Sequence, residues 1–257
     1  MIEGDWTYAS ASSIGTSHLQ SAHPVCQDFH ACAYIGEISA LIVVVSDGAG
    51  SSSRAEEGAE LTCKYVLDRL SKATESSLLS IDFSRTVLED LRDLLRQLAA
   101  DAKIKLREFA CTMLVAIVLP TRSVFWQIGD GAMCFRCAGE DHYNFAFWPE
   151  KGDYANVTFF VTDDSAQERL EFDIIERQIL EFASFTDGLE RLALDFVAGE
   201  VHTAFFRGLM PHLQGCDPGH SAKISAELCS FLASERVNNR TDDDKTLILA
   251  SRMSQVV

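Results

Sequence analysis

The amino-acid sequence predicts an α+β fold in which two stacked sheets carry helices on their outer faces. Strand-like segments occur in blocks, and helical segments occur in pairs close in sequence, unlike the regular alternation of parallel βαβ units. The run Leu41–Val45 is apolar at every position, which indicates a strand buried on both faces. No internal repeat or linker stands out, so residues 1–257 are expected to form a single domain.

The first half of the chain is expected to place a block of strands before two long helices. Aromatic, β-branched and small residues predict strands at Trp6–Ser13, Phe29–Ile35 and Ile38–Ser46. Apolar residues then recur at helical spacing in Arg54–Ser71 and in Asp82–Arg107. Each of these two helices should therefore present one apolar stripe to a sheet.

Beyond residue 110 the apolar period changes from helical to alternating. Consecutive strands joined by tight turns are expected at Thr112–Leu119, Ser123–Ile128 and Ala132–Cys137. The remaining predicted elements are strands at Val157–Thr162, Gln178–Phe185 and Thr246–Ala250, and helices at Gly199–Leu213 and Ser221–Val237. They would complete the strand blocks and supply the second helix pair.

The composition excludes several classes of protein. A chain of 257 residues with 47% apolar residues can bury a substantial core. A net charge of −16 argues against nucleic acid as a partner, because phosphate backbones require clustered Lys and Arg. The apolar runs are strand-sized and the acidic N-terminus lacks a secretory pattern, so neither a membrane span nor export is expected. We therefore expect a cytoplasmic protein without membrane contact.

The eight cysteines are expected to act mainly as small buried hydrophobes in a reducing compartment. Cys134 and Cys137 form one CxxC pair, but no second pair accompanies them. A structural zinc ion would need two further ligands, and the pair falls in a predicted strand. A zinc or redox role is therefore not expected.

Four short acidic motifs carry the chemistry, and three of them border strand-like runs. They are Gln27-Asp28, Asp47-Gly48, Asp187-Gly188 and Asp243-Asp244. Carboxylates without interleaved cysteine or histidine suit Mg²⁺ or Mn²⁺ better than zinc. Two such ions can share a water, lower its pKa and direct it at a phosphorus atom. Asp47, which follows the most apolar strand, fits the position between two ions.

A single Asp-Gly pair is most often only a turn, but the ordered set resembles the metal-dependent Ser/Thr protein phosphatases, the protein phosphatase 2C family. Members carry an acidic or Gln-Asp motif, an Asp-Gly-x-Gly turn, a Gly-Asp turn, Ser/Thr-Asp-Gly and a closing Asp-Asp/Asn-x-Thr. This chain has, in that order, Gln27-Asp28, Asp47-Gly48-Ala49-Gly50, Gly129-Asp130-Gly131, Thr186-Asp187-Gly188 and Asp243-Asp244-Lys245-Thr246. The match extends over nearly the whole chain.

The resemblance implies a four-layer αββα sandwich of two antiparallel sheets flanked by helix pairs, with the metals at one end. Asp47 would bridge two Mn²⁺ or Mg²⁺ ions, and Gly48 would lend its carbonyl. The other implied metal ligands are Asp187 and Asp243 at the first ion, Gln27 and Asp28 at the second, directly or through water, and Asp130 at a weaker third ion.

The implied reaction is attack of a hydroxide bridging the two metals on a phosphoserine or phosphothreonine ester, without a phosphoenzyme. The implied partners are phosphoserine and phosphothreonine proteins and an opposing Ser/Thr kinase. The implied catalytic residues are Asp47 and Asp28. His18 and His23 are candidates for the proton donor that a serine leaving group needs.

Three departures distinguish this chain from many family members, and together they resemble a divergent bacterial branch. His23 stands where many members have a phosphate-binding Arg, and Ala49 stands where many have His after Asp-Gly. Arg191 stands where the third-ion aspartate usually falls, so Glu190 would have to compensate or Arg191 would contact the phosphate. The two core ions are therefore expected, whereas the phosphate contact and the third ion differ.

Two alternatives remain open from the residues. Ala49, His23 and Arg191 would suit a weak or inactive phosphatase-fold module that binds phosphoproteins or regulatory partners. The same carboxylates would also suit a metal-dependent phosphohydrolase that acts on small phosphates. The three core aspartates favour the phosphoprotein phosphatase over an inactive module.

Overall fold

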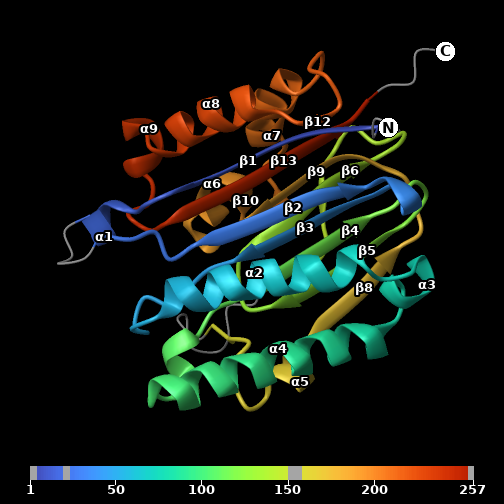
Figure 1. Cartoon of the computed structure of the whole chain (residues 1–257). Helices are drawn as coiled ribbons and strands as arrows, with labels where there is room; N and C mark the ends of the chain where they lie inside the picture. The colour runs from blue at the N-terminus through green and yellow to red at the C-terminus, as the bar shows by residue number, and fades with distance from the viewer. Residues whose placement is uncertain (1–4, 20–23, 150–157, 254–257) are drawn as a thin grey trace.

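The computed structural model describes residues 5–19, 24–149 and 158–253, and these form four layers (Figure 1). Two sheets are stacked face to face. The outer face of one is covered by α2 (Ala55–Ser71) and α4 (Ile81–Ala102), and the outer face of the other by α8 (Ala222–Leu232) and shorter helices. The predicted α+β sandwich is thereby confirmed.

The first sheet is antiparallel throughout and has the strand order β2-β3-β4-β5-β8. Its strands are β2 (Phe29–Ile35), β3 (Ala40–Ser46), β4 (Met113–Val118), β5 (Ser123–Ile128) and β8 (Glu171–Ile175). All seven residues of β3 are buried, because β3 has a strand on each side and is covered on both faces. This burial explains the unbroken apolar run in the sequence.

The second sheet has the order β12-β1-β13-β9-β6-β7. Its strands are β12 (Gly219–His220), β1 (Trp6–Ser13), β13 (Lys245–Arg252), β9 (Ile179–Phe185), β6 (Ala132–Cys137) and β7 (Asn144–Phe145). Strands β1 and β13 pair antiparallel over their full length, from Trp6 opposite Arg252 to Ser13 opposite Lys245. The segment after β1 therefore lies beside the closing Asp-Asp motif that precedes β13. Among the described strands, only β1 and β12 pair in parallel.

Short elements connect the two sheets and their helices. They are α1 (Thr16–Leu19), η1 (Gly36–Ile38), α3 (Glu75–Leu78), η2 (Leu106–Phe109), α5 (Ala166–Arg169), η3 (Asp187–Leu189), α6 (Glu190–Ala193), β10 (Leu194–Asp195), β11 (Glu200–Val201), α7 (Thr203–Leu209), η4 (Met210–His212) and α9 (Glu235–Asn238). None of the helices in the described ranges is long and apolar enough to cross a membrane.

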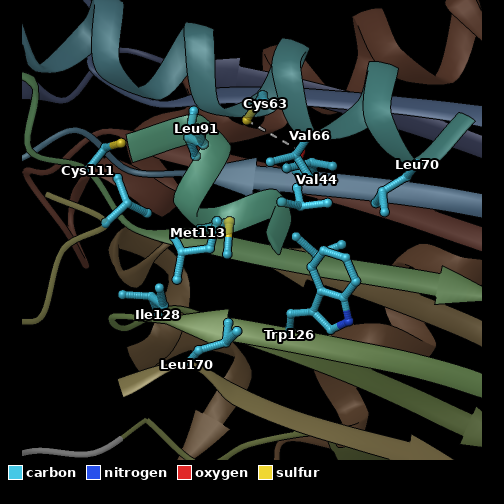
Figure 2. Packing of buried hydrophobic residues seen from close by; sticks show 14 of the residues in the cluster. Val44, Cys63, Val66, Leu70, Leu91, Cys111, Met113, Trp126, Ile128 and Leu170 are labelled. Atoms are coloured by element: carbon cyan, nitrogen blue, oxygen red, sulfur yellow. Dashed lines mark hydrogen bonds between the residues drawn. The ribbon is translucent and has the colours of Figure 1, made fainter. Parts of the chain in front are cut away.

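The core beneath α2 and α4 shows why the residues of β3 alternate in their contacts. Val44 faces the helices with Met113 and Trp126 and packs near Val66 of α2 (Figure 2). Val43, its neighbour, faces the other sheet instead. Burying one such side chain contributes roughly 1.5–3 kcal/mol, so both faces of β3 stabilise the sandwich.

The cysteines behave as weakly polar small residues. In Figure 2 the Cys63 thiol donates to the backbone carbonyl of Val44 over 3.7 Å. All eight cysteines are free, including the CxxC pair Cys134 and Cys137, which is buried in β6. The structure holds no cysteine cluster in the described residues that would suit zinc.

The layer between the sheets changes in polarity along its length. At one end it is aromatic, with Phe125 and Phe135 stacked at a ring-centroid distance of 5.5 Å. At the other end it carries Asp28, Thr186 and Thr246, all buried. Buried polar groups cost free energy unless they find partners. The polar end is therefore where a functional site is expected.

Several element boundaries differ from the prediction. The helix expected over Asp82–Arg107 ends at Ala102, because Lys103 adopts a left-handed φ of 56° and η2 follows. The strand expected over Val157–Thr162 is wrong for residues 158–162, which are irregular or turn, and residue 157 lies outside the described residues. Strand β8 was not predicted, although its alternation of polar and apolar residues suits an edge strand.

The C-terminal helices are shorter and more broken than the periodicity suggested. The expected helix Gly199–Leu213 begins with β11, continues as α7 and ends in η4, where Pro211 interrupts the regular hydrogen bonding. The expected helix Ser221–Val237 divides into α8 and α9. The second outer layer is therefore a set of short helices.

Candidate metal and active site

Three aspartates from strand ends converge at the polar end of the sandwich. Asp47 follows β3, Asp130 lies between β5 and β6, and Asp187 follows β9. One carboxylate oxygen from each lies within 4.8 Å of the other two. The strand ends of both sheets thus bring together residues that are far apart in sequence.

The three aspartates line a hollow of about 440 Å³. The predicted site residues that line it are His18, Asp47, Gly48, Asp130, Asp187 and Asp243. Gln27 and Asp28 lie behind this surface and do not line the hollow, and His23 lies outside the described residues. Ala49 also lines the hollow. Many family members carry a histidine at this position, so position 49 supplies no imidazole to the hollow in this chain.

The main chain at Asp47 is held from both directions by Thr112. The Asp47 N–H donates to Thr112 Oγ1 over 2.9 Å, and the Thr112 N–H donates to the Asp47 carbonyl over 2.8 Å. Ser46 Oγ donates to the Thr112 carbonyl over 2.6 Å. These bonds fix the end of β3 and leave the Asp47 carboxylate directed into the hollow. Sequence reasoning did not single out Thr112.

Gly48 joins the first acidic motif to the second. Its N–H donates to the Gln27 carbonyl over 3.2 Å. A Cβ at position 48 would lie 2.8 Å from the Gln27 carbonyl oxygen and from the Ala55 backbone, so only glycine fits. The absence of a side chain therefore lets Gln27 and Asp28 approach Asp47.

Asp28 is buried beneath the hollow, and Thr186 supports it. Thr186 Oγ1 donates to Asp28 Oδ2 over 2.8 Å, and the Thr246 N–H donates to Thr186 Oγ1 over 3.0 Å. Asp28 Oδ1 has no hydrogen-bond partner among the described residues, and the same is true of Gln27 Oε1 and Asp187 Oδ1. Buried oxygens of this kind need a cation or water to satisfy them.

The carboxylates are crowded enough to resist ionisation. Burial, followed by the nearby Asp244, raises the pKa of Asp28 to about 8, although the Thr186 hydroxyl opposes this shift. Burial, with Asp130 and Asp243 nearby, raises the pKa of Asp187 to about 7. Burial and the negative charge of Asp28 raise the pKa of Asp47 as well. A divalent cation would reverse these shifts, because it favours the ionised form of its ligands.

The donor set therefore fits a hard divalent cation. Every candidate ligand is an oxygen atom, and three carboxylates lie close together. Oxygen-only ligation is what Mg²⁺ and Mn²⁺ prefer. The unsatisfied oxygens of Gln27, Asp28 and Asp187 provide further ligand atoms or partners for metal-bound water.

The turn that carries Asp130 is supported by Glu190. The Gly131 N–H donates to Glu190 Oε1 over 3.1 Å, and Glu190 is buried. Thr158 Oγ1 donates to Asp130 Oδ2 over 2.6 Å. Arg191 is exposed and does not line the hollow, which gives no support to the phosphate contact that the sequence suggested for it. Glu190 acts on the Asp130 turn through the backbone.

Asp244 has a role that the sequence did not reveal. Its Oδ1 accepts from the Gly15 N–H over 2.6 Å, and its Oδ2 accepts from the Gln27 N–H over 2.6 Å and from His18 Nδ1 over 2.9 Å. A Cβ on Gly15 would lie 2.3 Å from the Asp243 carbonyl carbon. Asp244 thereby gathers the segments around residues 15, 18 and 27. The sequence signal that could have identified Asp244 was its position next to Asp243 in the closing motif.

The chain is similar to known proteins in sequence and in structure. A profile of the family described as "Protein phosphatase 2C" matches residues 14–233. "Serine/threonine-protein phosphatase 3" of Escherichia coli (strain K12) is 34% identical over 252 residues, covering 95% of this chain and 98% of that protein.

Solved structures show the same fold at lower identity. The serine/threonine phosphatase Stp1 from Staphylococcus aureus superposes with a TM-score of 0.64 at 14% identity, covering 96% of this chain and 95% of that one. The catalytic domain of the phosphatase PstP, solved in complex with 2 manganese ions, gives a TM-score of 0.65 at 11% identity, covering 97% of this chain and 99% of that one.

Proposed function

The chain belongs to the protein phosphatase 2C family, and from that premise we propose that it hydrolyses phosphoserine and phosphothreonine in proteins at a centre of two Mn²⁺ or Mg²⁺ ions. The observation that carries this proposal is the convergence of Asp47, Asp130 and Asp187, with oxygens within 4.8 Å of one another. They share one hollow with Asp243. A phosphate monoester can enter such an open, oxygen-lined site.

Asp47 is proposed as the residue shared by both ions, with Gly48 lending its carbonyl. Asp187 and Asp243 would be the other ligands of the first ion, and Gln27 and Asp28 would bind the second, directly or through water. When bound, the ions supply Lewis acidity that lowers the pKa of the attacking water and offsets the charge of the phosphate. The buried oxygens without protein partners support this assignment.

Asp130 is proposed to hold a third, weaker ion or to share one with Asp187. This proposal is supported by the short distance from the Asp130 carboxylate to those of Asp47 and Asp187, since one oxygen of each lies within 4.8 Å of the others. The Thr158 hydroxyl occupies one of its oxygens and Glu190 secures its turn. One oxygen of Asp130 therefore remains for a cation.

The chain's own residues orient the water and protonate the leaving group. Asp28 is proposed to be catalytic because its free Oδ1 can accept a hydrogen bond from water while Thr186 holds its Oδ2. His18 is proposed as the proton donor, since it lines the hollow where Ala49 provides no acid. His23 stays a proposal from the sequence, because it lies outside the described residues.

The cellular setting is also a proposal. An opposing Ser/Thr kinase must supply the phosphoproteins that such an enzyme consumes. A cytoplasmic location is supported by the eight free cysteines, because exported proteins usually pair theirs. The whole chain is proposed to act as one domain, because both sheets contribute residues to the same hollow.

Hydrolysis assays test the proposal directly. A phosphothreonine peptide and p-nitrophenyl phosphate are incubated with the protein in Mn²⁺, in Mg²⁺ or in EDTA. We expect release of phosphate from both substrates with either metal and none in EDTA. Metal-independent release would refute the metal centre. Hydrolysis of p-nitrophenyl phosphate alone would favour an enzyme acting on small phosphates.

The inactive-module alternative makes a different prediction. If Ala49 marks lost activity, the chain should bind a phosphothreonine peptide in Mn²⁺ without turning it over. Binding is measured by fluorescence anisotropy on the same peptide that is used for hydrolysis. Turnover of the peptide excludes this alternative.

A further inference from the structure

We propose that Asp244 is a positioning residue that orients His18 as the proton donor to the leaving oxygen of the substrate. This inference rests on the proposed function and assigns a role to a residue that the metal centre does not use. It explains how a chain with Ala49 after its Asp-Gly motif can expel a serine or threonine alkoxide.

The hydrogen bond between the two side chains determines which ring nitrogen faces the substrate. His18 Nδ1 lies 2.9 Å from Asp244 Oδ2, and because the carboxylate accepts, Nδ1 must donate. The other nitrogen, Nε2, lies toward Gly50: a Cβ built on Gly50 would be 3.9 Å from it. Gly50 and His18 both line the hollow, and 26% of the His18 side chain is exposed. Nε2 can therefore reach a bound ester.

Asp244 is itself held too firmly to serve as a metal ligand. It is only 2% exposed, and Gly15 occupies its Oδ1. Its Oδ2 accepts from the Gln27 N–H as well as from His18. Both oxygens of Asp244 thus accept hydrogen bonds from the protein, and Asp244 does not line the hollow. The adjacent Asp243 does line it. A fixed carboxylate behind an imidazole holds the ring in one orientation and one tautomer.

The surroundings leave few other proton donors. The remaining ionisable side chains that line the hollow in the described residues are aspartates, namely Asp47, Asp130, Asp187, Asp242 and Asp243. Those assigned to metal are needed in their ionised form. His18 is the basic side chain of that lining, and Asp244 gives it a partner on the side away from the substrate.

The proposed step balances with water as the co-reactant. The water oxygen forms a bond to phosphorus as the bond from phosphorus to the serine oxygen breaks. The electron pair of that bond stays on the serine oxygen, which takes the proton from His18 Nε2. The attacking water releases a proton to solvent, and His18 regains one from solvent. The products are the free hydroxyl and inorganic phosphate.

Dependence on the leaving group separates this role from a structural one. A phosphoserine peptide has a poor leaving group that needs an acid, whereas p-nitrophenol leaves readily without one. In saturating Mn²⁺, we expect His18→Gln to lower kcat for the peptide by roughly 100-fold or more, and to change kcat for p-nitrophenyl phosphate by less than about tenfold. Asp244→Asn should show the same selective loss.

A control variant, a chemical rescue and an NMR measurement complete the test of His18→Gln. His212→Gln is the matched control, because His212 is exposed and does not line the hollow, and both substrates should be turned over as in the wild type. Imidazole added to His18→Gly should restore peptide hydrolysis. In the metal-free protein, ¹⁵N NMR should show a proton on His18 Nδ1 that Asp244→Asn displaces to Nε2 or exposes to exchange.

The outcomes are distinct from those of the proposed function. Equal loss for both substrates in His18→Gln, or no loss for either, would overturn the proton-donor role. A wild-type protein that fails to hydrolyse p-nitrophenyl phosphate in Mn²⁺ would instead refute the phosphatase proposal. If Asp244→Asn does not fold, because its amide would face the Gln27 N–H, His18→Gln and the imidazole rescue decide the question.

Discussion

The Thr186 hydroxyl donates a hydrogen bond of 2.8 Å to Asp28 Oδ2 and so joins two motifs that stand 158 residues apart. Thr186 directly follows β9 of one sheet and Asp28 precedes β2 of the other. The bond therefore joins the two sheets beneath the hollow, which neither residue lines. It leaves Asp28 Oδ1 as the atom available to the site.

Replacing Thr186 with valine tests this bond while keeping the shape of the side chain. Thr186→Val should lower the free energy of unfolding by about 1–3 kcal/mol, because Asp28 Oδ2 loses its buried donor and the Thr246 N–H loses its acceptor. Urea denaturation of the metal-free protein measures the change. The control is Thr203→Val, which alters a residue at the start of α7, away from the hollow. Equal stability of both variants would contradict the account.

Gly15 lies so close to the backbone of Asp243 that we expect position 15 not to tolerate a side chain. Gly15→Ala would place a Cβ 2.3 Å from the Asp243 carbonyl carbon, so the closing motif must shift. We expect a clear fall in melting temperature and weaker Mn²⁺ binding. Gly36→Ala is the matched control, because a Cβ there meets nothing within 4 Å. A Gly15→Ala protein that binds Mn²⁺ as the wild type does would contradict this.

The raised pKa values predict how stability depends on pH in the absence of metal. The pKa of Asp28 is raised from 3.8 to about 8, so the folded state binds more protons than the unfolded state between these values. Stability of the metal-free protein should therefore be highest near the acidic end of this window and fall as pH rises toward 8. Urea unfolding at a series of pH values measures the slope.

Two controls isolate the contribution of Asp28. Asp28→Asn removes the titrating group and should flatten part of the slope. The other acidic residues, which dominate the net charge of −16, titrate in both proteins and contribute equally to both slopes. Saturating Mn²⁺ should flatten the slope further, because the metal holds its ligands ionised. A slope unchanged by both would show that Asp28 does not titrate as described.

The position of Arg191 predicts that its replacement has little effect on substrate binding, although the sequence allowed a direct contact between Arg191 and the phosphate. Arg191 is exposed and outside the hollow, so Arg191→Ala should change the KM for a phosphothreonine peptide by less than about twofold. Steady-state kinetics in Mn²⁺ give this value. A tenfold rise in KM would show that Arg191 contacts the phosphate.

The fold was predictable where periodicity and burial agreed. Strands β1, β2, β5 and β6 have the predicted bounds, because their residues alternate or run apolar between clear turns. The strand predicted over Val157–Thr162 is wrong for residues 158–162, whose apolar side chains lie in an irregular segment beside the hollow. Local pattern cannot distinguish a strand from a loop that is buried by a neighbouring element.

The candidate site was predictable in its aspartates but not in their supports. Asp47 and Asp187 were identified by their Asp-Gly motifs, and the structure brings them together. The supporting roles of Thr112 and Asp244 depend on contacts across the fold, which no sequence spacing encodes. Asp244 belongs to a recognised motif, but its supporting role is visible only from its hydrogen bonds to Gly15, His18 and Gln27.

Counting Mn²⁺ ions at Asp47 tests the central claim most directly. Isothermal titration calorimetry of the wild-type protein should give two sites, and Asp47→Asn should lose measurable binding at both, because Asp47 is proposed to join the two ions. Circular dichroism confirms that the variant is folded. Mn²⁺ binding in Asp47→Asn with unchanged stoichiometry and affinity would contradict the metal centre described for this chain.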